Sequence, residues 1–197
     1  MKKQAITLGR VGILLPIAAI IPVLGQLASI AALVLLIISH YYFSKKYEEP
    51  GIFKNALIGF ILQIAGSLIG GIILTVSVAS ASIKFSKGDM FSMGQLTNVL
   101  FESAFTIIGG LLILAGLIIG FYFLYKSLLS LAEKTNVKYF KTAGLLYFIG
   151  AIGMIVFFLG SIVIFVAWIF HIIAYFSIPQ EIPEITGADQ DQPGTQM

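Results

Sequence analysis

Four side chains that could do chemistry lie inside otherwise apolar stretches of this sequence. They are Gln63, Glu102, His171 and His40. Because an ionisable or amide group is costly in lipid, such residues are the first candidates for function in a membrane segment. An amide can line the path of a solute, a carboxylate can bind a cation or relay a proton, and an imidazole can titrate near neutral pH.

Two of these residues share a predicted helix face with glycines. The faces comprise Gly59, Gln63, Gly66 and Gly70 on one segment, and Glu102, Thr106, Gly109, Gly116 and Gly120 on the other. Small residues let helix backbones approach closely, and polar side chains then bond across the contact. We expect the two helices to pack antiparallel along these faces, with Gly66 and Gly70 close to Gly116 and Gly120. Gln63 should lie near Gly116–Gly120 and bond to another helix. The alternative is a polar lining of a solute path.

Glu102 begins its apolar segment near the predicted outer surface. The partner segment carries hydroxyls at the same level, at Ser77, Ser80 and Ser82. A carboxylate beside hydroxyls could bind a cation or relay a proton. The alternative is a glutamate in the first helical turn, which the helix dipole favours and lipid headgroups solvate.

The two histidines occupy different settings. His171 lies between Trp168 and Tyr175 at helical spacing, deep in the last apolar segment. His40 is followed by Tyr41 and Tyr42, a pattern typical of an interfacial aromatic belt. Two histidines without a carboxylate on the same helix make a poor metal site, so we expect no bound metal.

Composition excludes most soluble functions. The chain of 197 residues is 58% hydrophobic and only 11% charged, whereas a soluble domain carries about 25% charged residues. It has no cysteine, and it lacks the short motifs of zinc proteases, serine hydrolases and phosphate-binding loops. We expect a membrane protein without enzymatic activity, cofactor or nucleic-acid partner.

Four apolar blocks are separated by charged residues, at 4–44, 55–83, 99–125 and 142–178. The second and third suit single spans of about 20 residues. The last, as one helix of 37 residues, would extend about 55 Å across a hydrocarbon layer of about 30 Å. The two long blocks must therefore fold back or lie partly in the interface.

Breaks inside the long blocks favour folding back. The signals are Pro16, Pro22 and Gly25 in the first block, and the weaker Leu159, Gly160 and Ser161 in the last. Proline ends a helix because it lacks a backbone donor. The sequence therefore predicts an all-α transmembrane bundle over residues 1–178, with about six short spans arranged as a hairpin, a central antiparallel pair and a second hairpin.

Basic residues predict the orientation in the cell membrane. If the first block is a hairpin, the N-terminal end and the loops 45–54 and 126–141 share one side, with ten lysines and arginines against two in the loop 84–98. If that block crosses once, the split is seven against five. Since cytoplasmic loops are rich in lysine and arginine, we expect a cytoplasmic N-terminus.

The C-terminal segment, residues 179–197, differs from the rest. It holds three prolines and four acidic residues among few apolar ones. Such a stretch cannot bury enough apolar surface to offset the entropy of ordering. We expect a disordered acidic tail, either without a task or serving as a docking arm for a basic partner.

Three motifs resemble a known family. They are Phe53-Lys54-Asn55-Ala56-Leu57-Ile58-Gly59-Phe60, Leu131-Ala132-Glu133-Lys134-Thr135-Asn136-Val137 leading into Phe140-Lys141-Thr142-Ala143-Gly144, and Ala167-Trp168-Ile169 through Ala174-Tyr175-Phe176-Ser177-Ile178. In order and spacing they resemble the mainly archaeal membrane family catalogued as domain of unknown function 996, over about residues 6–178. That family has no assigned activity, so the resemblance implies no site residues.

Two functions remain open at this level. The first is a membrane scaffold or accessory subunit, embedded in the lipid bilayer and acting through helix packing with a second copy or a membrane-protein partner. The alternative is a small transporter or channel for an ion or small solute, with a polar path near Gln63, Glu102 and His171. A polar cavity reaching Gln63 or Glu102 would favour transport, and a dry glycine seam would favour the scaffold.

Overall fold

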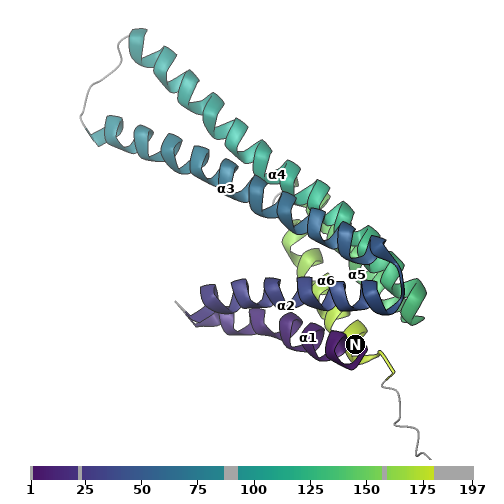
Figure 1. The fold of residues 1–197 in the computed structure, drawn as a ribbon. Helices are drawn as coiled ribbons and strands as arrows, with labels where there is room; N and C mark the ends of the chain where they lie inside the picture. The colour runs from purple at the N-terminus through teal and green to yellow at the C-terminus, as the bar shows by residue number, and fades with distance from the viewer. Residues whose placement is uncertain (1, 22–23, 87–92, 157–158, 180–197) are drawn as a thin grey trace, which may run out of the picture.

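The computed structural model describes residues 2–21, 24–86, 93–156 and 159–179, and within these ranges every regular element is a helix. Figure 1 shows them as an open helical bundle. The α-helices are α1 (Lys2–Leu14), α2 (Leu24–Lys46), α3 (Pro50–Ser86), α4 (Met93–Thr135), α5 (Lys138–Gly153) and α6 (Leu159–Phe176), and the 3₁₀ helix η1 (Leu15–Ile20) follows α1. The predicted all-α class is confirmed.

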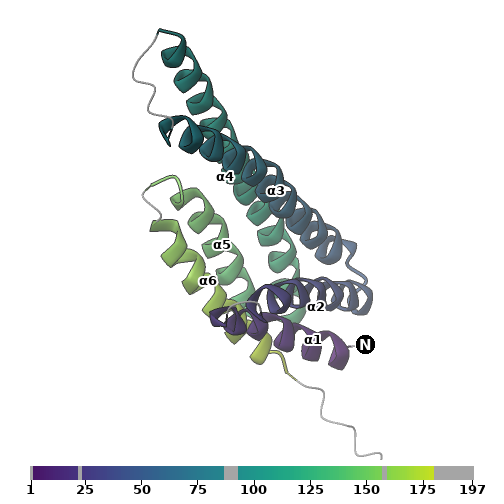
Figure 2. The ribbon, with the colours of Figure 1, turned by 90° about the vertical axis from the view of Figure 1, so that its left-hand side faces the viewer.

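Four of these helices are long and apolar enough to cross a membrane. The spans are Leu27–Lys46, Pro50–Ser80, Ser103–Thr135 and Leu159–Phe176. The remaining two, α1 with 13 residues and α5 with 16, are shorter, and each runs back along a longer neighbour, α1 beside α2 and α5 beside α6 (Figure 2). The protein is therefore membrane-embedded, built as a hairpin, a long central pair and a second hairpin.

The break in the first apolar block lies where proline predicts it. Helix α1 ends at Leu14, and Pro16 lies in the first turn of η1. Proline has no donor to continue an α-helical ladder but is tolerated in a first turn. Gly25 already lies in α2, where its N–H donates to the Ile21 carbonyl at 2.8 Å, and Pro22 lies outside the described residues.

The break in the last block is not where the sequence suggested. We expected the turn at Leu159, Gly160 and Ser161, but these residues begin α6, and α5 already ends at Gly153. Gly160 instead allows a close helix contact, because a Cβ built on it would meet the Gly150 carbonyl oxygen of α5. Gly160 is needed for packing between α5 and α6. In a single sequence, a glycine required for helix packing cannot be distinguished from a glycine required for a turn.

The central hairpin is longer than its apolar blocks. With 37 and 43 residues, α3 and α4 extend about 55 and 65 Å at 1.5 Å per residue, and Figure 1 shows their far ends reaching past the other helices. The buried core uses α3 from Ile52 to Phe60 and α4 from Phe121 to Ala132. The other helices therefore pack against only one half of this hairpin.

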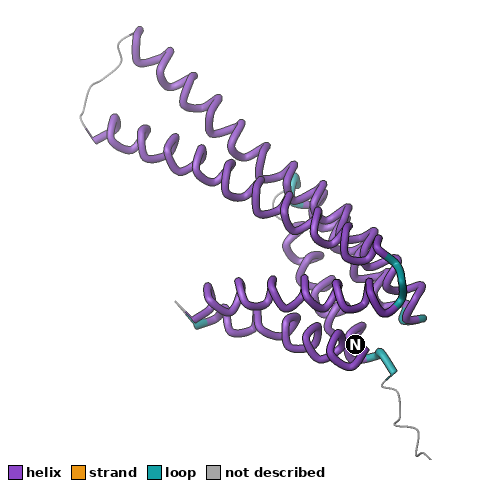
Figure 3. The backbone as a smooth tube through the Cα atoms, viewed as in Figure 1, coloured by secondary structure: helices purple, strands orange, loops and turns teal. Residues whose placement is uncertain are grey.

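The short connections meet at that same end of the bundle (Figure 3). An ion pair of 3.7 Å between Glu49 Oε2 and Lys134 Nζ joins the α2–α3 connection to the last turn of α4. The α2–α3 and α4–α5 connections each contain one residue with positive φ, Glu48 at 51° and Asn136 at 59°, which turns the chain sharply between helices. The tertiary structure thus groups the loops that the basic residues assign to one side.

Candidate functional site

Glycines bring the backbones of α3 and α4 into contact at three levels. A Cβ built at Gly59 would lie 2.7 Å from the Gly120 carbonyl oxygen. At Gly66 it would lie 2.8 Å from the Gly116 Cα, and at Gly70 it would lie 2.5 Å from the Gly109 carbonyl oxygen. We call these six residues the glycine seam. Any side chain at these positions would force the two helices apart.

The register of the seam differs in detail from the simplest expectation. The sequence suggested Gly66 and Gly70 against Gly116 and Gly120. In the structure Gly66 faces Gly116, but Gly70 faces Gly109 and Gly120 faces Gly59. In an antiparallel pair, residue numbers rise along one helix while they fall along the other. With Gly66 against Gly116, the earlier Gly59 therefore meets the later Gly120, and the later Gly70 meets the earlier Gly109.

Gln63 lies in this seam, but its amide nitrogen lacks the partner we expected. Its Cγ would lie 2.5 Å from a Cβ at Gly120, so Gly120 makes room for the glutamine stem. Its Nε2 is buried and makes no hydrogen bond. Helix α4 presents mainly backbone there, and the backbone groups of a helix interior are already bonded along the helix.

The structure leaves the Glu102 hypothesis open. The side chains of Glu102 and Ser82 lie outside the described residues. Ser77 and Ser80 donate to carbonyls of their own helix, those of Ile73 and Val76, at 2.9 Å each. These two hydroxyls therefore form hydrogen bonds with backbone carbonyls of α3 itself, as serine commonly does in an apolar helix.

His171 is buried in an aromatic pocket between α5 and α6. Its side chain is 3% exposed. Its ring stacks on Tyr175 at 5.2 Å and meets the edges of Tyr147 at 5.8 Å and Phe140 at 6.0 Å between centroids. The imidazole Nε2 has no hydrogen-bond partner. The structure therefore separates His171 from Gln63, which lies in the seam between α3 and α4.

The interpretation of His40 as an interfacial belt residue is wrong. His40 is fully buried, whereas its neighbour Tyr41 is 42% exposed. Its Nδ1 lies 2.7 Å from the Leu36 carbonyl oxygen, and its ring meets Phe60 of α3 edge-on at 6.4 Å. Packing of α3 against α2 covers this position, which neighbouring tyrosines in the sequence could not reveal.

Ser39, Tyr147 and Tyr175 form a buried polar cluster together with the two histidines. The sequence analysis did not predict that these five residues lie together. Ser39 Oγ donates to the Ala5 carbonyl of α1 at 2.7 Å and lies 3.3 Å from the Tyr175 hydroxyl of α6. Gly9 gives the Tyr175 ring its space. We call Ser39, His40, Tyr147, His171 and Tyr175 the polar core. The i, i+4 spacing of His171 and Tyr175 was its only visible signal.

Two side chains tie the N-terminal helix to α6. Arg10 Nε donates to the Tyr175 carbonyl oxygen at 3.1 Å, and the guanidinium carbon lies 4.8 Å from the centre of the Phe176 ring. Trp168 Nε1 donates to the Ile13 carbonyl oxygen at 2.9 Å. Arg10 thus satisfies a carbonyl that the end of α6 would leave unpaired, besides adding to the basic N-terminal end.

The chemistry available in this core is limited. Among the described residues no group of three or more histidines, cysteines or acids is placed to hold a metal ion. The polar core instead joins helices that are distant in sequence, through a serine, two tyrosines and two imidazoles surrounded by apolar side chains.

Comparison with known proteins gives one family and one curated relative. The family described as protein of unknown function (DUF996) matches residues 28–169, which include the whole glycine seam. The chain is 33% identical over 180 residues to the uncharacterized protein MJ1644 of Methanocaldococcus jannaschii, a similarity that covers 91% of this chain and 94% of that protein. No solved structure gives a significant match.

Proposed function

Since this chain belongs to the DUF996 family of proteins of unknown function and carries four helices suited to span a membrane, we propose that it is a non-enzymatic membrane scaffold or accessory subunit. It acts through helix packing with a second copy of itself or with another membrane protein. Its place is the cell membrane, with the N-terminus on the cytoplasmic side.

The glycine seam is the observation that carries this proposal. Glycines hold the α3 and α4 backbones together at three levels, from Gly59 to Gly70. Backbones this close leave no room for a solute between them at those levels. A closely packed hairpin is a stable platform for further helices.

The far half of the hairpin supplies the surface for such packing. Beyond the buried core, large apolar side chains of both helices are more than half exposed, among them Leu68, Ile72, Val76, Ile107 and Leu111. A lipid-facing surface and a surface for another transmembrane helix have the same apolar composition. The hairpin can therefore receive a further helix without any change in its own structure.

The protein's mass in its native lipid environment tests the proposal. Extraction in polymer nanodiscs followed by mass measurement should give particles with more than one protein chain. Proteoliposomes made from the same protein should show no flux of protons, sodium, potassium or chloride above empty vesicles. A particle with a single chain, together with saturable flux of one of these ions, would contradict the scaffold.

A transporter is the second candidate, favoured by one observation. Three buried nitrogens, Nε2 of Gln63, His40 and His171, have no hydrogen-bond partner, and unpaired polar groups inside a membrane protein often mark a functional site. This candidate predicts ion flux in proteoliposomes that His171→Phe abolishes and that Tyr139→Phe, at an exposed aromatic on α5, leaves intact.

A further inference from the structure

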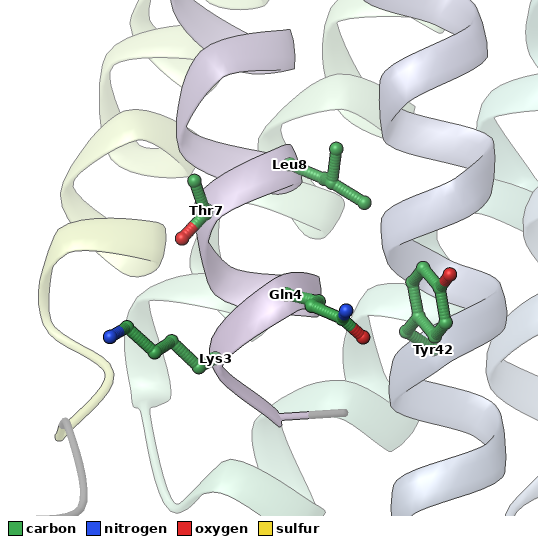
Figure 4. A pocket seen from close by; sticks show the side chains of 5 residues that line it. All are labelled: Lys3, Gln4, Thr7, Leu8 and Tyr42. Carbon is green, nitrogen blue, oxygen red and sulfur yellow. The ribbon is translucent and has the colours of Figure 1, made fainter.

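A groove of about 400 Å³ lies between the start of α1 and the end of α2. Lys3, Gln4, Thr7 and Leu8 line it from α1, and Tyr42 lines it from α2. Figure 4 shows Gln4 and Leu8 pointing toward α2, with the Tyr42 ring between the two helices. We propose that this groove binds the phosphate headgroup of an anionic phospholipid, with an acyl chain along α1.

The groove lies where a headgroup would be. Tyr42 precedes Lys45 and Lys46 by one helical turn, and the membrane span of α2 ends at Lys46. Lysine and tyrosine are enriched where a helix leaves the hydrocarbon layer. Lys3 stands at the beginning of the antiparallel α1, so the same level of the bundle holds cations from both helices.

The polar lining matches a phosphate group. The Gln4 amide and the Tyr42 hydroxyl, from facing sides of α1 and α2, can donate hydrogen bonds to phosphate oxygens. The Lys3 side chain extends from the other side of α1 (Figure 4) and adds positive charge at this level. None of the described residues that line the groove carries a carboxylate, and none of the described carboxylates pairs with Lys3. Basic side chains at a membrane surface attract anionic lipids, which selects an anionic headgroup over a zwitterionic one.

The apolar part of the surface selects a lipid over free phosphate. Leu8 lines the groove on the side away from Lys3, and Val11 and Leu14 continue along α1 with 47% and 37% of their side chains exposed. These side chains lead from the headgroup level into the membrane, as an acyl chain does. Inorganic phosphate would gain nothing from them.

Native mass spectrometry of the whole chain tests the site. After delipidation and titration with phosphatidylglycerol or phosphatidylcholine, wild-type protein should retain one phosphatidylglycerol in clear preference to phosphatidylcholine. The double variant Lys3→Gln with Tyr42→Phe should lower that retention several-fold. The control Lys138→Gln removes an exposed lysine at the start of α5 and should leave retention unchanged. Equal loss in both variants, or no preference between the two lipids, would overturn the site.

Thermal unfolding in detergent separates the two sources of phosphate. Phosphatidylglycerol should raise the melting temperature of wild-type protein, and the double variant should melt like wild type without lipid but lose most of this shift. Inorganic phosphate at equal concentration should give no shift. If inorganic phosphate matches the lipid, the groove is a free-anion site and the lipid assignment is wrong.

Discussion

At the scale of single residues, the polar core joins helices that the chain alone keeps apart. Ser39 contacts α1 through the Ala5 carbonyl and α6 through the Tyr175 hydroxyl. A buried hydrogen bond contributes modestly to stability, but an unsatisfied buried group costs its full desolvation. The tyrosine and serine therefore fix the relative position of the first and last hairpins.

Tyr175→Phe should destabilise the protein by about 1 kcal/mol. The variant keeps the ring that packs on His171 and Phe140 but leaves Ser39 without its second partner. Unfolding in dodecyl sulfate titration measures the change. Tyr139→Phe, which alters an exposed tyrosine on α5, is the control and should match wild type. A Tyr175→Phe variant as stable as wild type would show that this hydroxyl contributes nothing.

Gln63→Met should stabilise the protein by about 1 kcal/mol, because it removes a buried nitrogen that has no partner. The contrasting variant is Ser127→Ala, which removes a hydroxyl that donates to the Ile52 carbonyl at 2.6 Å and should destabilise by a similar amount. The same titration compares the two. If Gln63→Met lowers stability, the amide has a hydrogen-bond partner in the membrane. The interpretation of the glycine seam as closed to water and solute at Gln63 is then wrong.

At the scale of elements, neighbouring glycines of one helix have different environments. Gly66 and Gly109 face the partner helix across the seam, whereas Gly71 and Gly110 have no atom within 4 Å of a built Cβ. The amino-acid composition does not distinguish these four glycines. Only the helix pairing decides which of them a side chain can replace.

Gly66→Leu should disrupt the α3–α4 hairpin at a cost of at least about 2 kcal/mol, because the side chain would meet the Gly116 backbone. Gly71→Leu places the same side chain five residues along α3 into open space, and should leave folding intact since leucine favours a helix over glycine. Expression level and unfolding in dodecyl sulfate report both. Equal damage from the two substitutions would show that α3 and α4 do not meet along this face.

At the scale of the whole molecule, the α2–α3 and α4–α5 connections share one end with the two termini of the described bundle (Figure 3). The Glu49–Lys134 ion pair joins the α2–α3 connection to the last turn of α4, and Arg10 bonds the last turn of α6. Glu49 and Lys134 are about 40% exposed, so the ion pair adds little stability. The arrangement matches the ten-to-two division of basic residues, whose cytoplasmic assignment stays a prediction.

Cysteine accessibility in intact cells tests that orientation. The chain has no cysteine of its own, so a single introduced thiol reports its own location. A membrane-impermeant maleimide should label Gly88→Cys, in the loop expected outside, and should label Glu48→Cys only after the cells are opened. Labelling of Glu48→Cys from outside would reverse the topology.

The sequence by itself determined the membrane class, the helical content and the division into hairpin, central pair and hairpin. These follow from composition and apolar block length, which any fold of this chain must respect. It also named the residues of the glycine seam, because a helical face is periodic in sequence. The acidic tail, predicted for residues 179–197, lies outside the described residues from 180 onward and stays a prediction.

Only the tertiary structure decided what each polar residue and each glycine contacts. His40 beside two tyrosines has the sequence pattern of a belt residue, yet packing of α3 buries it. Gly160 has the sequence pattern of a turn, yet it lies inside α6 against α5. Burial and pairing depend on helices far apart in the chain. A single sequence determines local periodicity, but it leaves open which face meets which neighbour.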